Sequence, residues 1–134
     1  MPASAPSLPP VIERLQHAWN THDLEAFVAC FAPNYQSVQP CRPDRKIRVR
    51  DQVRKIWSIM FTEVPDFRSD LLGFATQGDE TWVELHWYWM DADGVQVDLW
   101  GVMRFQIQDD CLQSARVYLE SILPPVPWAG DAIE

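Results

Sequence analysis

Two neighbouring stretches of this chain alternate apolar and polar residues for almost their whole length. Between residues 81 and 90, one face carries Val83, Leu85, Trp87 and Trp89. Between residues 95 and 108, one face carries Val95, Val97, Leu99, Gly101, Met103, Phe105 and Ile107. A period of two over this length predicts a long antiparallel hairpin with one apolar face. Other elements must cover that face, and they decide whether the domain contains a cavity.

The two apolar faces lie on the same side only if the hairpin loop has an odd number of residues. Ala92, Asp93 and Gly94 meet this requirement if Gly94 adopts the left-handed conformation. The register then gives three facing pairs, which are Tyr88 with Asp98, His86 with Trp100, and Trp82 with Arg104.

Three amphipathic helices are expected before the hairpin. Residues 8–19 show helical spacing, Asp23 caps a second helix that Pro33 stops, and Asp51 caps a third that ends at Val64 and Pro65. Residues 34–49 should be irregular or form short extended segments, and strands at 67–75 and 112–122 should flank the hairpin. We therefore expect an α+β fold with three N-terminal helices packed on a strongly curved four-stranded antiparallel sheet, a cone with a central hollow.

The length of 134 residues predicts one domain, over residues 11–122, with tails at 1–10 and 123–134. A net charge of -8 argues against nucleic acid and anionic membranes as partners. The start of the chain does not resemble a secretory signal, and no apolar run has the length of a membrane helix, so a cytoplasmic location is expected. Cys30, Cys41 and Cys111 lack metal-ligand spacing, which favours free thiols and no metal site.

Several short runs resemble the SnoaL-like branch of the nuclear-transport-factor-two-like superfamily. They are Trp19-Asn20-Thr21-His22-Asp23-Leu24-Glu25-Ala26-Phe27, Phe31-Ala32-Pro33-Asn34-Tyr35, Val64-Pro65-Asp66-Phe67, Trp100-Gly101 with Arg104-Phe105, and Arg116-Val117-Tyr118-Leu119-Glu120. The resemblance implies the cone fold, which hosts polyketide cyclases, ketosteroid isomerases, dehydratases, epoxide hydrolases and ligand binders. Fold alone does not select among these activities.

At three positions this chain lacks the catalytic residues that ketosteroid isomerases of this superfamily have. Those enzymes place a carboxylate base before the Pro after the second helix, where this chain has Gln39 before Pro40. An amide cannot abstract a proton at neutral pH. Leu15 and Gly101 stand where the oxyanion donors are expected. The Asp-Arg-Asp relay of related epoxide hydrolases is also missing from the inner strand positions, which are apolar.

The resemblance places a catalytic acid of SnoaL-like cyclases near Glu120. Strand parity points Glu120 outward with Arg116 and Tyr118, unless a bulge at the strand end turns it inward. The alternative is an ion pair with Arg104 or Arg116 on the convex face. Tyr35, the second catalytic candidate, and Asn20 could orient a substrate, or they could serve packing and capping.

The hollow should be lined by Trp19, Asn20, Trp57, Phe61, Leu85, Trp87, Met103 and Val117, as substrate-binding residues or simply as core. Seven of the eleven basic residues fall between Arg42 and Lys55. This run could steer an anionic substrate to the cavity mouth, or it could be a solvated surface.

The sequence thus predicts a small apolar or aromatic ligand in the cavity, with either of two roles for the protein. It could be a cofactor-free cyclase, isomerase or dehydratase, or a non-catalytic binding or dimerisation module. His86, beside Glu84 and opposite Asp98, could shuttle protons or lie in a subunit interface. A homodimer is expected through the convex sheet face, formed by Trp82, Glu84, His86, Tyr88, Trp100, Arg104 and Tyr118.

Overall fold

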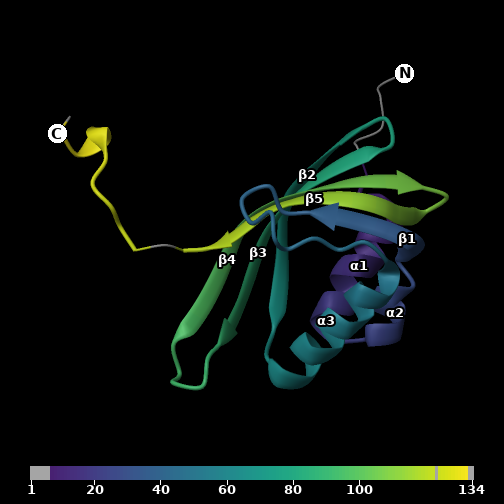
Figure 1. Cartoon of the computed structure of the whole chain (residues 1–134), viewed down its shortest axis with the longest axis horizontal. Coiled ribbons are helices and arrows are strands. Elements are labelled where there is room, and N and C mark those ends of the chain that lie inside the picture. Colours follow the sequence, from purple (N-terminus) through teal and green to yellow (C-terminus); the bar gives the residue numbers. More distant parts are fainter. Residues whose placement is uncertain (1–6, 123, 133–134) are drawn as a thin grey trace.

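In a computed structural model, which describes residues 7–122 and 124–132, three helices lie on one side of a strongly curved sheet (Figure 1). The helices are α1 (Pro10–Thr21), α2 (Leu24–Val28) and α3 (Arg50–Glu63). The strands are β1 (Phe31–Val38), β2 (Arg68–Gln77), β3 (Glu80–Met90), β4 (Gln96–Gln108) and β5 (Cys111–Ser121), and a short 3₁₀ helix, η1, covers Ala129–Ala132. Residues 1–6, 123, 133 and 134, which belong to the two expected tails, lie outside the described residues.

The sheet has five strands in the order β1-β5-β4-β3-β2, and β1 pairs with β5 in parallel. The prediction of four antiparallel strands was therefore wrong. The second helix was expected to include Phe31 and to stop at Pro33, with irregular or short extended segments over residues 34–49, but α2 ends at Val28 and Pro33 lies inside β1. Pro33 is tolerated because β1 is an edge strand and its pairing with β5 is irregular between Phe31 and Gln36.

The long hairpin of β3 and β4 has the expected register. Tyr88 faces Asp98, His86 faces Trp100, and Trp82 faces Arg104. Five residues, 91–95, connect the last facing pair, and this odd number keeps both apolar faces on one side. Gly94 has a φ of 77°, and the Asp91 carboxylate accepts hydrogen bonds from the backbone N–H groups of Asp93 and Val95, both at 2.9 Å.

Gly101 lies in the middle of β4, where the sheet curves. A Cβ atom at this position would collide with the backbone carbonyl oxygen of Tyr118 in β5. Glycine inside a strand is typical of a sharp bend or a close backbone approach. The absence of a side chain at Gly101 therefore lets β4 and β5 approach at this bend.

The amphipathic helix α1 buries Val11, Ile12, Leu15, Ala18 and Trp19 against the sheet, as its spacing predicts. Its polar end covers the free edge of β2. The Asn20 amide accepts a hydrogen bond from the backbone N–H of Ser69 and donates one to its carbonyl oxygen, both at 2.8 Å. No helix in residues 7–122 and 124–132 is long and apolar enough to cross a membrane.

The three cysteines are free thiols. Cys30 is buried and Cys41 is exposed. Burial raises the pKa of Cys30 to about 11, although the nearby Arg14 opposes the shift. Cys30 is therefore protonated at neutral pH and serves as an apolar side chain of the core.

Candidate functional site

An aromatic cavity of about 280 Å³ lies between the helices and the inner face of the sheet. Helices α1, α2 and α3, strand β1 and the segment after it form one wall, and β3, β4 and β5 form the other. The aromatic side chains in the walls are Trp19, Phe27, Phe31, Tyr35, Trp57, Trp87, Trp89 and Phe105. This pocket lies against the apolar face of the hairpin, which contributes Trp87, Trp89, Leu99, Met103 and Phe105 to its wall.

Trp57 of α3 is the centre of the aromatic packing. Its ring lies 5.3 Å from the ring of Trp87 in an edge-to-face arrangement, with an interplanar angle of 89°. The rings of Phe27 and Phe67 lie 5.2 Å and 5.3 Å away from it. Edge-to-face contacts of this kind add to the stability given by burial and restrict ring motion. The aromatic wall is therefore preformed.

Hydrogen bonds from α1 hold the indole of Trp87 in place. Trp87 Nε1 donates to Ser69 Oγ at 3.0 Å, and Ser69 Oγ donates to Gln16 Oε1 at 2.9 Å. The indole N–H of Trp19 is buried and has no hydrogen-bond partner within the described part of the chain. A buried donor without a partner is costly. Because Trp19 lines the cavity, its N–H is available to a ligand there.

Tyr35 of β1 lies in the cavity wall with only 2% of its surface exposed. Burial raises its pKa, and a hydrogen bond with Ser37 opposes the shift only in part. The phenol is therefore neutral at physiological pH. It can hydrogen-bond to a ligand, but it is not a base.

Glu120 lies on the outer face of the sheet, because it pairs with the outward-facing Trp100 in β4. The irregularity in the β4–β5 pairing lies at Gln106 and Ile107, so no bulge turns the end of β5 inward. Arg42 Nε donates to Glu120 Oε1 at 3.2 Å, in place of the expected Arg104 or Arg116. The carboxylate does not reach the cavity, so the geometry gives it no role as acid or base there.

Six of the expected site residues line the cavity, and they are Trp19, Tyr35, Trp57, Trp87, Met103 and Val117. Three expected substrate-binding residues lie elsewhere. Asn20 binds the edge of β2, Phe61 stacks on the imidazole of His22 at 5.1 Å, and Leu85 is fully buried in the core. Among the described residues, no carboxylate or imidazole lines this cavity.

The segment between β1 and α3 contributes wall residues that the binding-site prediction did not include. Gln39, Arg45 and Ile47 all lie in the wall. Two backbone hydrogen bonds between Ser37 and Ile47, at 2.9 Å and 3.1 Å, fix the base of this segment. Two features of the sequence could have pointed to this segment. Gln39 stands where the isomerases have their catalytic base, and Arg45 belongs to the run of basic residues.

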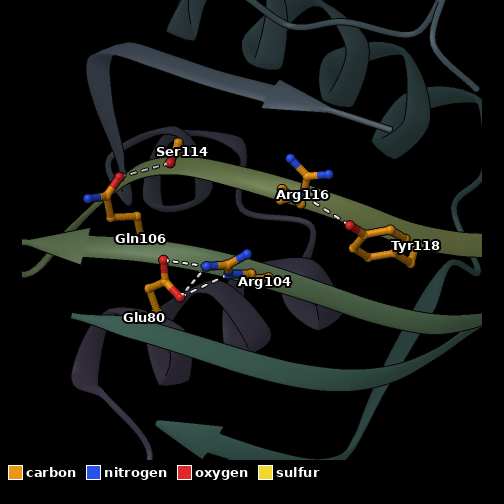
Figure 2. Close-up of polar contacts among 6 residues, drawn as sticks. All are labelled: Glu80, Arg104, Gln106, Ser114, Arg116 and Tyr118. Atoms are coloured by element: carbon orange, nitrogen blue, oxygen red, sulfur yellow. Dashed lines mark hydrogen bonds and ion pairs between the residues drawn. The ribbon is translucent and has the colours of Figure 1, made fainter. Parts of the chain in front are cut away.

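Polar side chains on the outer face of the sheet form hydrogen bonds and an ion pair, and Figure 2 shows six of these side chains across β3, β4 and β5. Arg104 donates to both carboxylate oxygens of Glu80, at 2.7 Å and 2.9 Å, and Arg116 Nε donates to the hydroxyl of Tyr118 at 2.9 Å. An open polar depression of about 290 Å³ lies beside them. Glu80 already neutralises Arg104, and no aromatic side chain is among the described residues that line this depression, so it is a weaker candidate site than the aromatic cavity.

No cluster of three or more His, Cys, Asp or Glu side chains suited to a metal ion occurs in residues 7–122 and 124–132. The cavity therefore has aromatic and neutral polar groups as its main chemistry, with one arginine in its wall.

Helices packed on a strongly curved sheet are the arrangement of the NTF2-like class, and comparison with known proteins agrees. The profile of the SnoaL-like domain family matches residues 12–113, which is well over half of the chain. The chain belongs to this SnoaL-like family. No curated protein sequence matches it significantly.

Solved structures of several different proteins share the fold. A candidate polyketide cyclase from Sinorhizobium meliloti superposes with a TM-score of 0.67 at 17% identity, over 84% of this chain and 95% of the other. An LEH-like epoxide hydrolase from M. tuberculosis gives 0.72 at 15% identity, over 84% and 81%. A protein with a ketosteroid isomerase-like fold from Catenulispora acidiphila, solved with trimethylamine, gives 0.68 at 12% identity, over 82% and 85%. At these identities the likeness shows the fold alone.

Proposed function

We propose that this protein binds a small aromatic or polyketide-like molecule in the cavity, without acid–base chemistry by its own side chains. One observation carries the proposal: the aromatic wall, as far as the described residues go, contains no carboxylate or imidazole. Its volume of about 280 Å³ lies near the lower end of the roughly 300–1,000 Å³ typical of small-molecule sites. A ligand with one or two rings fits such a volume.

Neutral donors would orient this ligand. The Tyr35 hydroxyl and the unused indole N–H of Trp19 belong to wall residues, and both can donate to a carbonyl or hydroxyl oxygen. They supply orientation and polarisation but no proton abstraction. The binding role is therefore favoured over the cyclase, isomerase or dehydratase role that Glu120 would have supported.

Filling the cavity tests the proposal. Val117→Phe adds a ring inside the wall, whereas Val95→Phe makes the same change at an exposed position, 59% accessible, in the hairpin loop. Titration with 2-naphthamide, followed by tryptophan fluorescence, should show binding to the wild type and to Val95→Phe. Binding to Val117→Phe should weaken at least about tenfold, because the added ring competes for the same space. Equal affinity of a folded Val117→Phe variant would exclude the cavity as the site.

We also propose a homodimer through the outer sheet face. Trp82 and Trp100 are 39% and 44% exposed there, and the Trp100 ring stacks on His86 at 3.7 Å. Exposed Glu84 and Arg116 have no ion-pair partner among the described residues. In a two-fold interface the same patch meets itself, so such opposite charges can pair between copies.

Light scattering tests this interface. His86→Glu adds a negative charge beside Asp98, which binds His86 Nε2 at 2.6 Å, so the dimer should shift toward monomer. His17→Glu on the exposed side of α1 is the matched control and should leave the mass unchanged. If His86→Glu keeps the dimer mass, this face does not pair.

A further inference from the structure

One positively charged side chain lies in the wall of the aromatic cavity. Arg45 lines the cavity and is exposed to solvent. Its backbone N–H bonds to the carbonyl oxygen of Arg42, but its guanidinium has no hydrogen bond or ion pair with any described residue. Gln39 also lies in the wall, and its side-chain amide likewise has no hydrogen bond with any described residue. Both groups are therefore free to meet a ligand.

Three other arginines in the same basic run have side-chain partners, and Arg48, which has none among the described residues, does not line the cavity. Arg42 pairs with Glu120, and Arg54 forms an ion pair with Glu25. Arg50 Nη1 donates to the carbonyl oxygen of Phe31 at 3.3 Å. Arg45 differs from these three because it combines a free guanidinium with a place in the cavity wall.

A guanidinium at the rim of an apolar cavity suits one kind of ligand. Its planar donors match a carboxylate, which can accept two parallel hydrogen bonds. The side-chain amide of Gln39 adds a further donor. The aromatic walls can pack against an apolar ring, but they offer no positive charge to pair with an anion. The ring of such a ligand must therefore lie inside the cavity, with its anionic group at the rim.

We infer that the cavity takes an aromatic carboxylate, with its ring among the tryptophans and its anionic group bound by Arg45 and Gln39. This inference rests on the proposed function, because it names the substrate class of the same cavity. The chain has a net charge of -8, so general attraction of anions does not account for such a preference. A local cation is required.

A matched pair of probes tests the inference. 2-Naphthoate and 2-naphthamide have nearly the same shape, but only the first is an anion at pH 7. Wild-type protein should bind the acid at least about fivefold more tightly at low salt. Arg45→Gln should weaken the acid about tenfold or more, since hydrogen bonds to charged groups contribute more than neutral ones, and should change amide binding less than about twofold. Gln39→Glu, which places a carboxylate beside the rim, should also weaken the acid selectively.

Lys46→Gln is the control, because it removes the same charge from an adjacent exposed residue that does not line the cavity. Acid binding to this variant should stay within about twofold of wild type. If Lys46→Gln and Arg45→Gln have the same effect, or if Arg45→Gln has none while both probes bind, the carboxylate preference is overturned and the cavity function stands. If neither probe binds the wild type, the proposed function fails, and the inference fails with it.

Discussion

The side chain of Asn20 satisfies both backbone groups of Ser69 at the free edge of β2, and its removal should destabilise the domain. Ser69 is fully buried, and its N–H and carbonyl oxygen each lie 2.8 Å from the Asn20 amide. In Asn20→Ala the carbonyl oxygen keeps its bond from Gln16, but the N–H loses the Asn20 oxygen that accepts its hydrogen bond. One lost hydrogen bond costs about 1 kcal/mol, and a buried donor left unsatisfied costs about 1–3 kcal/mol. The expected loss is about 2–4 kcal/mol.

Urea denaturation followed by tryptophan fluorescence and circular dichroism measures this loss. A stability decrease of this size is a large fraction of the roughly 5–15 kcal/mol of a typical domain, so the midpoint should shift clearly with an unchanged slope. Asn34→Ala is the control, because Asn34 is exposed in β1 and its side chain has no partner among the described residues. It should cost less than about 0.5 kcal/mol. If Asn20→Ala costs no more than this control, the hydrogen bonds do not stabilise the edge.

Three further outcomes are expected. Gly101→Ala should lower the Tm sharply or prevent folding, because its Cβ would collide with a carbonyl oxygen of β5, whereas Gly73→Ala, with nothing within 4 Å of its Cβ, should shift the Tm only slightly in thermal melts. At pH 8, iodoacetamide should label exposed Cys41 but not Cys30, whose pKa of about 11 keeps it protonated; mass spectrometry identifies the labelled peptide, and equal labelling would contradict the burial. The pKa of Asp98 is lowered from its ordinary value of 3.8, first by a hydrogen bond from the Gln96 amide in the same strand and second by the hydrogen bond with His86 across the hairpin. The wild type should therefore be more stable than Asp98→Asn at neutral pH, and this difference should shrink as the pH falls below 3.8 and Asp98 becomes protonated. Urea midpoints measured for both proteins at several pH values test this, and a difference that grows on acidification would refute the prediction.

The hairpin could be predicted in detail because its residues obey a strict period. Alternation at Val83, Leu85 and Trp87 leaves only one face that can be buried, and a register slip by one residue would expose all of them. The facing pairs and the apolar cavity wall follow from this parity. The outward orientation of Glu120 follows from the same rule.

Strand β1 could not be found in this way. Phe27 and Phe31 are spaced as on a helix, and Pro33 and Asn34 interrupt any alternation in the strand. The parallel partner of β1 is β5, which lies near the other end of the sequence. Local patterns carry no information about such a distant pairing, so the fifth strand emerges only from tertiary structure.

The polar part of the site was harder to predict than its apolar wall. An amide at the end of a helix, such as Asn20, can face a cavity or a strand edge, and the position of β2 decides between them. Arg45 and Gln39 lie outside the helices and strands, where no period assigns a face. Their residue types gave a hint of function, but only the tertiary structure places them in one wall.

The ion pair between Arg42 and Glu120 links β5 to the segment that carries Gln39 and Arg45. Glu120 can therefore influence the cavity rim without touching a ligand. Loss of binding in Glu120→Gln would resemble the loss of a catalytic acid, although its cause would be a displaced segment. Arg42→Gln should then reproduce the defect, and the double variant should be no worse than either single one. Such non-additivity would identify Glu120 as a distant support of the rim, and a screen based on single substitutions would miss the difference.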